Sequence, residues 1–174
     1  MRRRHAYTFV EIAIVVLAMG ILAGVAAPKY TESMDYFRVE SASKRVAADL
    51  RYARAIAARR ASNQSVAFDL ADDAYWLAGV ADLTHGGDSY GVALADEGYE
   101  SDLQVADFDG SATITFDHRG DCNASGGVVV IAGGQARYVV VTPPGEITIR
   151  KDNDEGSVSV DPAATLGQIV ADML

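Results

Sequence analysis

Cysteine is nearly absent from this chain. The 174 residues contain one cysteine, Cys122. A single cysteine cannot form a disulfide within the chain, so the fold must be stabilised by packing alone. The lone thiol leaves the redox compartment of the protein undecided.

Histidine is also scarce, and signatures of catalysis are missing. The three histidines are His5, His85 and His118, and His118 lies between Asp117 and Cys122. Neighbours in one turn rarely point at one substrate, and their spacing does not match that of zinc ligands. The sequence also lacks a nucleophile elbow, a His-Glu-x-x-His motif and a phosphate-binding loop. We therefore expect a protein that is not an enzyme.

Positive charge is rare in the larger, C-terminal part of the chain. Nineteen of the 24 acidic residues follow Asn63, but only four of the 15 basic residues do. Such an acidic domain repels phosphate backbones, which makes nucleic acid an unsuitable partner. Divalent cations or basic patches on other proteins fit this charge better.

Two acidic stretches could offer oxygen ligands to calcium. They are 107–110 and 152–156, and each contains closely spaced carboxylates beside a glycine. Neither stretch matches a complete calcium-loop signature. We therefore expect no cofactor, and we keep calcium binding at Asp152, Asp154 and Glu155 as the alternative.

Against these absences stands one long apolar segment near the N-terminus. Residues 7–27 contain a single charge, Glu11. As a helix the segment would be roughly 31 Å long, which matches the hydrocarbon core of a bilayer. Arg2, Arg3 and Arg4 precede it, so the N-terminus is expected to stay cytoplasmic and the residues from Lys29 onward to be translocated.

The apolar segment allows three interpretations. It could be a cleaved secretory signal, a simple signal anchor, or a span in which Glu11 has a function. A carboxylate inside a membrane costs about 2.5 kcal/mol or more, so intramembrane acids normally have a partner. Signal peptides and simple anchors gain nothing from such an acid. The third interpretation therefore explains the sequence best.

The residues around Glu11 resemble a known processing signal. Residues 6–11, Ala-Tyr-Thr-Phe-Val-Glu, are followed by an apolar helix and then by Pro28. This arrangement resembles the class III signal of type IV prepilins and type II secretion pseudopilins, which usually have Gly before the cut and Phe after it. The resemblance implies that a prepilin peptidase removes residues 1–6 by cutting between Ala6 and Tyr7. It also implies N-methylation of Tyr7.

The same resemblance implies how the span is used. Glu11 lies one helical turn after Tyr7, so its carboxylate could meet the Tyr7 ammonium of a neighbouring subunit in a helical stack. Each charge would offset the desolvation cost of the other and favour docking in one register. Gly20 and Pro28 match family positions where the helix bends, and Pro28 removes a backbone hydrogen bond. Residues 7–28 are thus expected to form a transmembrane and filament-core helix.

After Pro28 the pattern predicts an amphipathic continuation of the helix over residues 29–63. We expect Ser62 and Asn63 to end this helix, because asparagine tolerates the left-handed conformation. The arginines of this region are either solvated or paired with acidic surfaces of adjacent subunits. Apolar residues recur at spacings of three and four and form a stripe that should pack on a sheet: Val39, Ala42, Val46, Leu50, Ala53 and Ala57.

Residues 64–150 are predicted to form an antiparallel β domain. Alternating apolar residues predict a hairpin of 65–70 and 75–80, and residues 81–110 are interpreted as a long loop with a short strand near 103–105. Pro162 could open a short helix in the tail of residues 151–174, with Leu166, Ile169, Val170 and Met173 on its apolar side. Four further runs separated by turn residues predict a meander: 112–116, 127–132, 137–142 and 146–150.

The globular part resembles the H-type minor pseudopilins, the GspH/FimT-like group. The matching segments are the Asp-Leu-Arg-x-Ala-Arg pattern at 49–54, Trp76 on the second strand, the Thr-Phe-Asp-x-x-Gly turn at 115–120 and the strand pair 138–147. This resemblance implies an α+β pilin fold. In that fold a long N-terminal helix, its first half transmembrane, packs on an antiparallel β-sheet.

The expected function follows from both resemblances. They imply a structural minor pseudopilin in a type II secretion pseudopilus that supports protein export. Its partners would be other pilins or pseudopilins, prepilin peptidase and the inner-membrane assembly platform. The chain would first be a single-pass inner-membrane protein with a periplasmic globular domain. Two alternatives remain: a minor subunit of a type IV pilus, and a signal-cleaved, secreted β-rich domain that binds a ligand.

Overall fold

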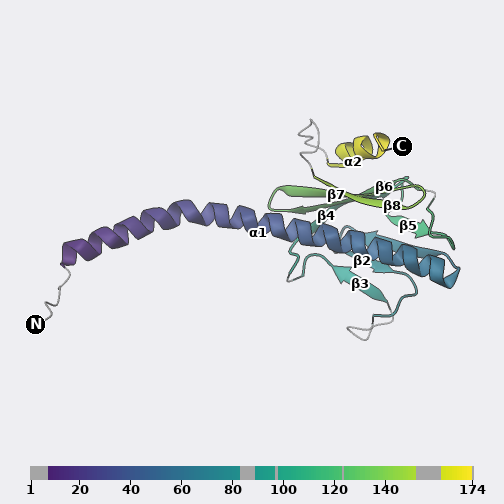
Figure 1. Cartoon of the computed structure of the whole chain (residues 1–174), viewed down its shortest axis with the longest axis horizontal. Helices are drawn as coiled ribbons and strands as arrows, with labels where there is room; N and C mark the ends of the chain where they lie inside the picture. Colours follow the sequence, from purple (N-terminus) through teal and green to yellow (C-terminus); the bar gives the residue numbers. More distant parts are fainter. Residues whose placement is uncertain (1–7, 83–88, 97, 123, 152–161, 174) are drawn as a thin grey trace, which may run out of the picture. The chain divides into compact units, whose positions relative to one another are not determined.

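A computed structural model describes residues 8–82, 89–96, 98–122, 124–151 and 162–173. The chain divides into two compact units, Met1–Met34 and Asp35–Leu174. Figure 1 shows the order of the elements along the chain, from helix α1 in purple and blue to helix α2 in yellow. We describe each unit separately and call the second one unit 2.

Helix α1 spans Phe9–Arg60 and contributes to both units. In the first unit, residues 8–24 are exposed to solvent along their whole length. The backbone is helical at both Gly20 and Pro28. A bend at these two positions stays a prediction, and so does the boundary of the span at residue 28.

From Asp35 onward, α1 is amphipathic, as the sequence predicts. Its stripe is almost completely buried: Val39, Ala42, Val46, Leu50, Ala53 and Ala57 are each at most 1% exposed. Apolar residues at these spacings face one side of a helix and bury it against a sheet. The predicted packing of this stripe is thus confirmed.

The C-terminus of α1 differs from the prediction by two residues. Ala61, rather than Asn63, has the left-handed conformation, with φ of 48°. The N–H of Ser62 donates to the carbonyl of Ala57 at 3.2 Å, which is the long-range bond of a Schellman-type helix end. The expectation for Asn63 was wrong because this backbone bond requires the turn immediately after Arg60.

Unit 2 contains a first antiparallel sheet of four strands in the order β3-β2-β1-β5. Strands β1 (Gln64–Asp69) and β2 (Ala74–Leu77) form the predicted hairpin, with Ala67 opposite Trp76. Strand β5 (Thr113–Phe116) pairs with the other edge of β1. Strand β3 (Tyr90–Ala93) pairs with β2.

The second sheet has the order β4-β6-β7-β8 and is also antiparallel. Strand β4 is Asp102–Phe108 and β6 is Gly126–Ala132. Strands β7 (Gln135–Thr142) and β8 (Glu146–Lys151) follow β6 through short turns. The strands β6, β7 and β8 form the meander that the turn residues predict.

Two sequence-based expectations for the β domain were wrong. Residues 112–116 leave the predicted meander and join the first sheet, because β5 pairs with β1. The interval 81–110 is not a long loop, since it contains β3 and the seven-residue strand β4, although the short strand predicted near 103–105 does lie within β4. The alternation in these two strands is weak because β3 is a short edge strand and β4 carries a bulge between Leu103 and Val105.

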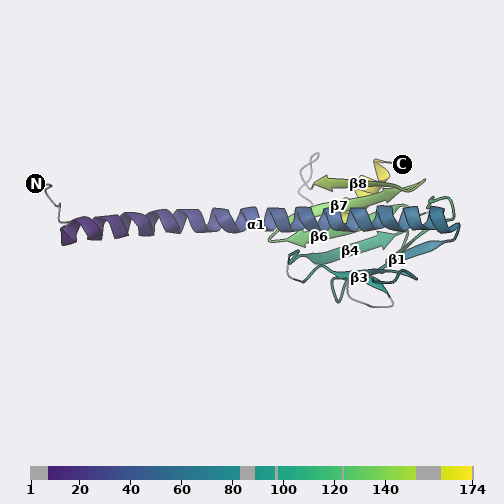
Figure 2. The same cartoon turned by 60° about the horizontal axis from the view of Figure 1, so that its bottom comes forward.

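The two sheets meet where β4 and β5 approach each other. A bridge joins Phe108 to Ser111, and the N–H of Phe68 donates to the carbonyl of Ala112 at 3.0 Å. Figure 2 shows the resulting succession of strands, with β8 and β3 at opposite edges and the C-terminal half of α1 in front of them. The main core lies between this half of α1 and the strands.

A second, smaller helix covers the other face of the second sheet. Helix α2 is Pro162–Ala171, which confirms the predicted helix in the tail. Leu166 is 2% exposed and packs with Val129, Tyr138 and Val140, while Val128 and Val130 face the main core instead. Because neighbouring strand residues point to opposite faces, α1 and α2 lie on opposite sides of the second sheet.

Removal of the central contact of α2 should destabilise unit 2. Leu166→Ala deletes buried methyl groups, so the free energy of unfolding should fall by about 2–3 kcal/mol. Gln168→Ala, on the exposed side of α2, is the matched control and should change it by less than about 0.5 kcal/mol. Trp76 is the one tryptophan, so urea unfolding of the detergent-solubilised chain can be followed by its fluorescence. Equal midpoints for both variants would contradict this packing.

Candidate functional site

Glu11 lies in the first turn of α1, where its position has a local structural role. The N–H of Glu11 donates to Oγ1 of Thr8 at 3.2 Å, so Thr8 caps the helix. A Thr-x-x-Glu pattern at a helix start is a capping box, and an acid near a helix N-terminus is stabilised by the helix dipole. The sequence analysis missed this cap, although the pattern itself could have revealed it.

The predicted partner of Glu11 is Tyr7 of a neighbouring subunit. Ala6 and Tyr7, the predicted cleavage and methylation positions, lie outside the described residues. The pairing of Glu11 with Tyr7 of a neighbouring subunit therefore stays a prediction.

The rest of the first unit presents apolar side chains to its surroundings. Among the described residues, one helix is long and apolar enough to cross a membrane, with a mean hydropathy of 2.5 over its most apolar 18-residue window. No part of that window is buried within the chain. Such a surface is costly in water and suits contact with lipid or with other apolar helices. The exposed large residues include Phe9 (87%), Leu17 (65%) and Leu22 (70%).

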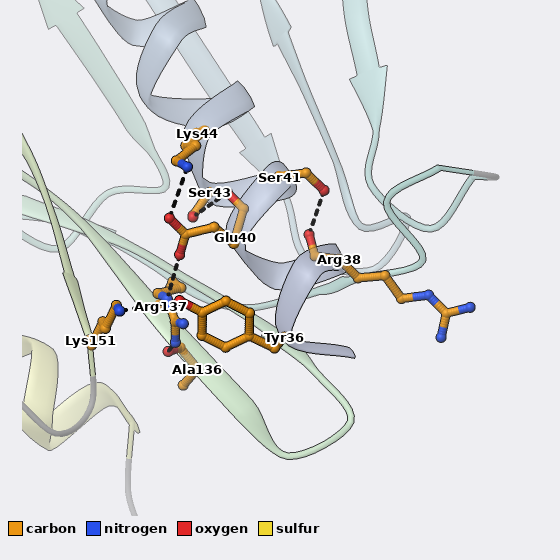
Figure 3. A network of polar contacts seen from close by, with 9 residues as sticks. All are labelled: Tyr36, Arg38, Glu40, Ser41, Ser43, Lys44, Ala136, Arg137 and Lys151. Carbon is orange, nitrogen blue, oxygen red and sulfur yellow. Dashed lines mark hydrogen bonds and ion pairs between the residues drawn. The ribbon is translucent and has the colours of Figure 1, made fainter. Parts of the chain in front are cut away.

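Unit 2 carries a polar cluster at the beginning of its part of α1, drawn in Figure 3. Nε of Arg137, on β7, donates to Oε2 of Glu40 at 3.0 Å, and Nζ of Lys44 lies 3.0 Å from Oε1 of Glu40. The guanidinium of Arg137 stacks over the ring of Tyr36, with its Cζ 4.9 Å from the ring centroid. Nζ of Lys151, on β8, donates to the Tyr36 hydroxyl at 3.2 Å. This cluster joins α1 to two strands of the second sheet.

Glu40 is the carboxylate of this cluster and pairs with both Lys44 and Arg137. Hydrogen bonds from Lys44 and Arg137 lower the pKa of Glu40, although its partial burial acts in the opposite direction. The hydrogen bond and the charge of Lys151 lower the pKa of Tyr36. Arg137 is only 3% exposed, so its charge depends on Glu40 for compensation. The role of this cluster is to fix α1 against the sheet.

A second polar cluster joins α1 to the first sheet. Asp49 is 6% exposed, and its Oδ2 accepts hydrogen bonds from the Tyr75 hydroxyl at 2.6 Å and from Nε of Arg45 at 3.0 Å. Its Oδ1 accepts a bond from the Tyr90 hydroxyl at 3.0 Å. Burial and the Asp49 carboxylate raise the pKa of Tyr75, and they raise that of Tyr90 to about 12. Both phenols therefore remain protonated donors.

The arginines of α1 have a use that the sequence analysis did not consider. Arg51, Arg54 and Arg60 donate to backbone carbonyls of Ile147, Gly120 and Gly79 at 2.8, 2.8 and 3.1 Å. They therefore hold loops and strands of their own chain rather than being only solvated.

Arg54 passes close to two glycines. A Cβ on Gly120 would lie 3.1 Å from Cγ of Arg54, and one on Gly145 would lie 2.9 Å from the Gly120 carbonyl oxygen. Both glycines also have positive φ, of 85° and 104°. These two turns require glycine because both have positive φ and because a Cβ at either position would press on Arg54 or on the Gly120 carbonyl.

The described part of the chain contains no group of three His, Cys, Asp or Glu side chains that could hold a metal ion. Asp152, Asp154 and Glu155, the calcium candidates, lie outside it. Oδ1 of Asp117 instead accepts the N–H groups of Arg119 and Asp121. Cys122 is 4% exposed, and burial raises the pKa of its thiol.

These observations define a class of protein. An exposed apolar helix, continued by an amphipathic half that packs on antiparallel sheets, is the architecture of a pilin-type subunit. The family model of type II transport protein GspH matches residues 42–164. This match covers most of the chain, and the chain belongs to the GspH family within the type IV pilin and pseudopilin superfamily.

Solved structures agree with this fold. Two crystal forms of the type IV minor pilin FimU from Pseudomonas aeruginosa PAO1 are similar to the chain, with TM-scores of 0.50 and 0.51. Their sequences are 14% and 15% identical to it, and the matches cover 70% and 76% of this chain and 99% of each FimU chain. No curated protein matches the chain. The expected α+β pilin fold is thus confirmed.

The Glu40 cluster predicts a defined dependence of stability on pH. Because the pKa of Glu40 is lowered in the folded state, its stabilisation is present above its unfolded-state pKa and is lost as pH falls through the folded-state value. Glu40→Gln should therefore lower the free energy of unfolding at pH 7 by about 1–2 kcal/mol. Its stability should also fall less than that of the wild type between pH 5 and about pH 3.

Lys44→Gln provides the matched control, because the Lys44 side chain is 65% exposed. Its effect at pH 7 should stay below about 1 kcal/mol. Urea unfolding followed by Trp76 fluorescence measures both variants. Identical pH profiles for Glu40→Gln and the wild type would show that Glu40 does not stabilise the folded chain.

Proposed function

We propose that this chain is a minor pseudopilin that assembles into the pseudopilus of a type II secretion system and supports protein export. The observation that carries this proposal is the fully exposed apolar half of α1, attached to a domain of the GspH family. A surface of this kind suits a subunit that is stored in the membrane and then packed against other helices. The chain is assigned no catalytic step.

A minor subunit of a type IV pilus is the second candidate, favoured by the shared fold with the minor pilin FimU. The family description, a type II transport protein, favours the secretion system. Deletion of the gene separates the two roles. Loss of protein export with intact pili supports the pseudopilin, whereas loss of pili with intact protein export supports the pilin.

Processing and topology belong to the same proposal. Prepilin peptidase cuts between Ala6 and Tyr7, and the new N-terminus at Tyr7 is methylated. The chain crosses the inner membrane once, with its N-terminus in the cytoplasm and unit 2 in the periplasm. The arginines at positions 2–4 support this orientation, since positive residues are retained on the cytoplasmic side.

The mature N-terminus tests this processing. Mass spectrometry of the chain purified from membranes should show a first residue of Tyr7 carrying one methyl group. The apolar segment should remain attached, because the cut removes only residues 1–6. A mature chain that starts near Pro28 would instead support the signal-cleaved, secreted domain.

Glu11 is assigned a docking role in assembly. Its carboxylate pairs with the Tyr7 ammonium of a neighbouring subunit, which compensates both charges in an apolar setting. The helix cap at Thr8 is a local role for the same region, so a test must separate charge from capping.

Two substitutions separate these roles. Glu11→Gln keeps a residue that suits a capping box but removes the charge, so incorporation into filaments should fall severalfold while membrane insertion stays normal. Thr8→Ala removes the cap and keeps the charge, so incorporation should remain near the wild-type level. The ratio of sheared filament to membrane-bound protein measures both. Normal incorporation of Glu11→Gln would exclude the charge pairing.

A further inference from the structure

The two outermost strands of unit 2 differ in the charge around them. Strand β8 ends one side of the succession of strands and β3 ends the other, as Figure 2 shows. A free sheet edge is a natural contact surface, because its outward backbone groups have no neighbouring strand.

The β8 edge is basic. Arg150 and Lys151 belong to β8, while Arg51 and Arg54 reach it and its preceding turn from α1. None of these four cations has a carboxylate within 4.0 Å in the described part of the chain, whereas Arg38, Arg45 and Arg137 each do. The buried Nε of Arg150 has no hydrogen-bond partner there either. Among the described residues, no carboxylate compensates the positive charge of the basic edge.

The opposite side of unit 2 carries an acidic corner. It consists of the turn between β1 and β2 and the connection from β3 to β4. Backbone groups hold these segments together: the N–H of Leu94 donates to the carbonyl of Asp73 at 2.8 Å, and the N–H of Leu103 donates to Oδ1 of Asp73 at 2.7 Å. The exposed acids of the corner are Asp72, Asp96, Glu100 and Asp102.

Among the residues that the structure describes, only part of this acidic charge is compensated. Arg38 pairs with Glu100 and also with Asp35. In the described ranges, Asp72, Asp96 and Asp102 have no basic side chain within 4.0 Å. The acidic corner thus complements the basic edge in charge, but the two lie on opposite sides of unit 2.

We propose that the basic edge formed by Arg51, Arg54, Arg150 and Lys151 binds the acidic corner of a second copy of this chain. A surface on one side that matches a different surface on the other side gives a head-to-tail contact, which builds an open helical assembly rather than a closed dimer. Complementary charge also sets the register of such a contact. The inference rests on the proposed assembly function and names a contact within it.

The positions along α1 add a geometric requirement. Arg38 pairs with Glu100 of the acidic corner, and Arg51 bonds to the Ile147 carbonyl at the basic edge. The two arginines therefore give the positions along α1 at which the two surfaces lie. These positions on α1 are roughly 20 Å apart at 1.5 Å per residue. The contact therefore needs copies that are displaced along the helix direction, as successive subunits of a filament are.

Disulfide cross-linking between two full-length copies tests the contact. The native cysteine is replaced by alanine (Cys122→Ala), and differently tagged copies carrying Ala55→Cys and Ala95→Cys are expressed together. Ala55 is one turn from Arg51, and Ala95 is next to Asp96; both are exposed. The yield of disulfide between the Ala55→Cys and Ala95→Cys copies should be severalfold higher than that of a control pair in which one copy carries Thr113→Cys instead. Thr113 is an exposed position on β5. Equal yields for both pairs would overturn the proposal.

Charge reversal shows whether the contact is electrostatic. Arg51→Glu or Asp96→Lys alone should lower the yield roughly three- to tenfold, because each places like charges opposite one another. Both substitutions in every copy should restore it. Loss without restoration, or cross-links only to other subunits, would exclude docking between copies of this chain.

Filament incorporation is measured in the same cells. If the chain is incorporated but the selective cross-link is missing, the docking inference fails while the proposed function stands. If the wild-type chain is never incorporated, both fail.

Discussion

The structure depends on one constraint, which is that the first half of α1 presents apolar side chains in every direction. Residues 8–24 are exposed on all sides, and the most apolar window of the helix buries nothing within the chain. Water is a poor environment for such a surface, whereas lipid and other apolar helices cover it equally well. In the proposed function, a subunit with this property is stored in a membrane and withdrawn into a bundle of helices without refolding.

In unit 2, the second half of α1 is held in one orientation about its own axis. Its apolar stripe is buried against the sheets, and two polar clusters centred on Glu40 and Asp49 hold it from both sides. Burial alone is tolerant of small rotations, but buried ion pairs and phenol hydrogen bonds are directional. Arg51 and Arg54 extend this attachment to the turns around β8.

Much of this arrangement could be predicted from the sequence, because strong periodic patterns have one physical solution. The stripe from Val39 to Ala57, the hairpin around Asp72 and the tail helix with Leu166 all follow from spacing alone. The pairing of β5 with β1 could not be predicted, since it joins residues far apart in the chain. The roles of Glu40 and Asp49 were also missed, because their partners Arg137 and Tyr75 come from distant strands. The cap at Thr8 is visible in the sequence as Thr-x-x-Glu, and it was missed because Glu11 was interpreted only through its place in the apolar span.

The central claim is that other helices replace lipid around the apolar half of α1 when the protein functions. A photo-reactive amino acid at Val15, which is 48% exposed, tests this claim in cells. With the secretion machinery present, the account predicts cross-links to the apolar helices of other pilin-type subunits, and without it cross-links to lipid alone. Cross-links to lipid alone under both conditions would contradict the account.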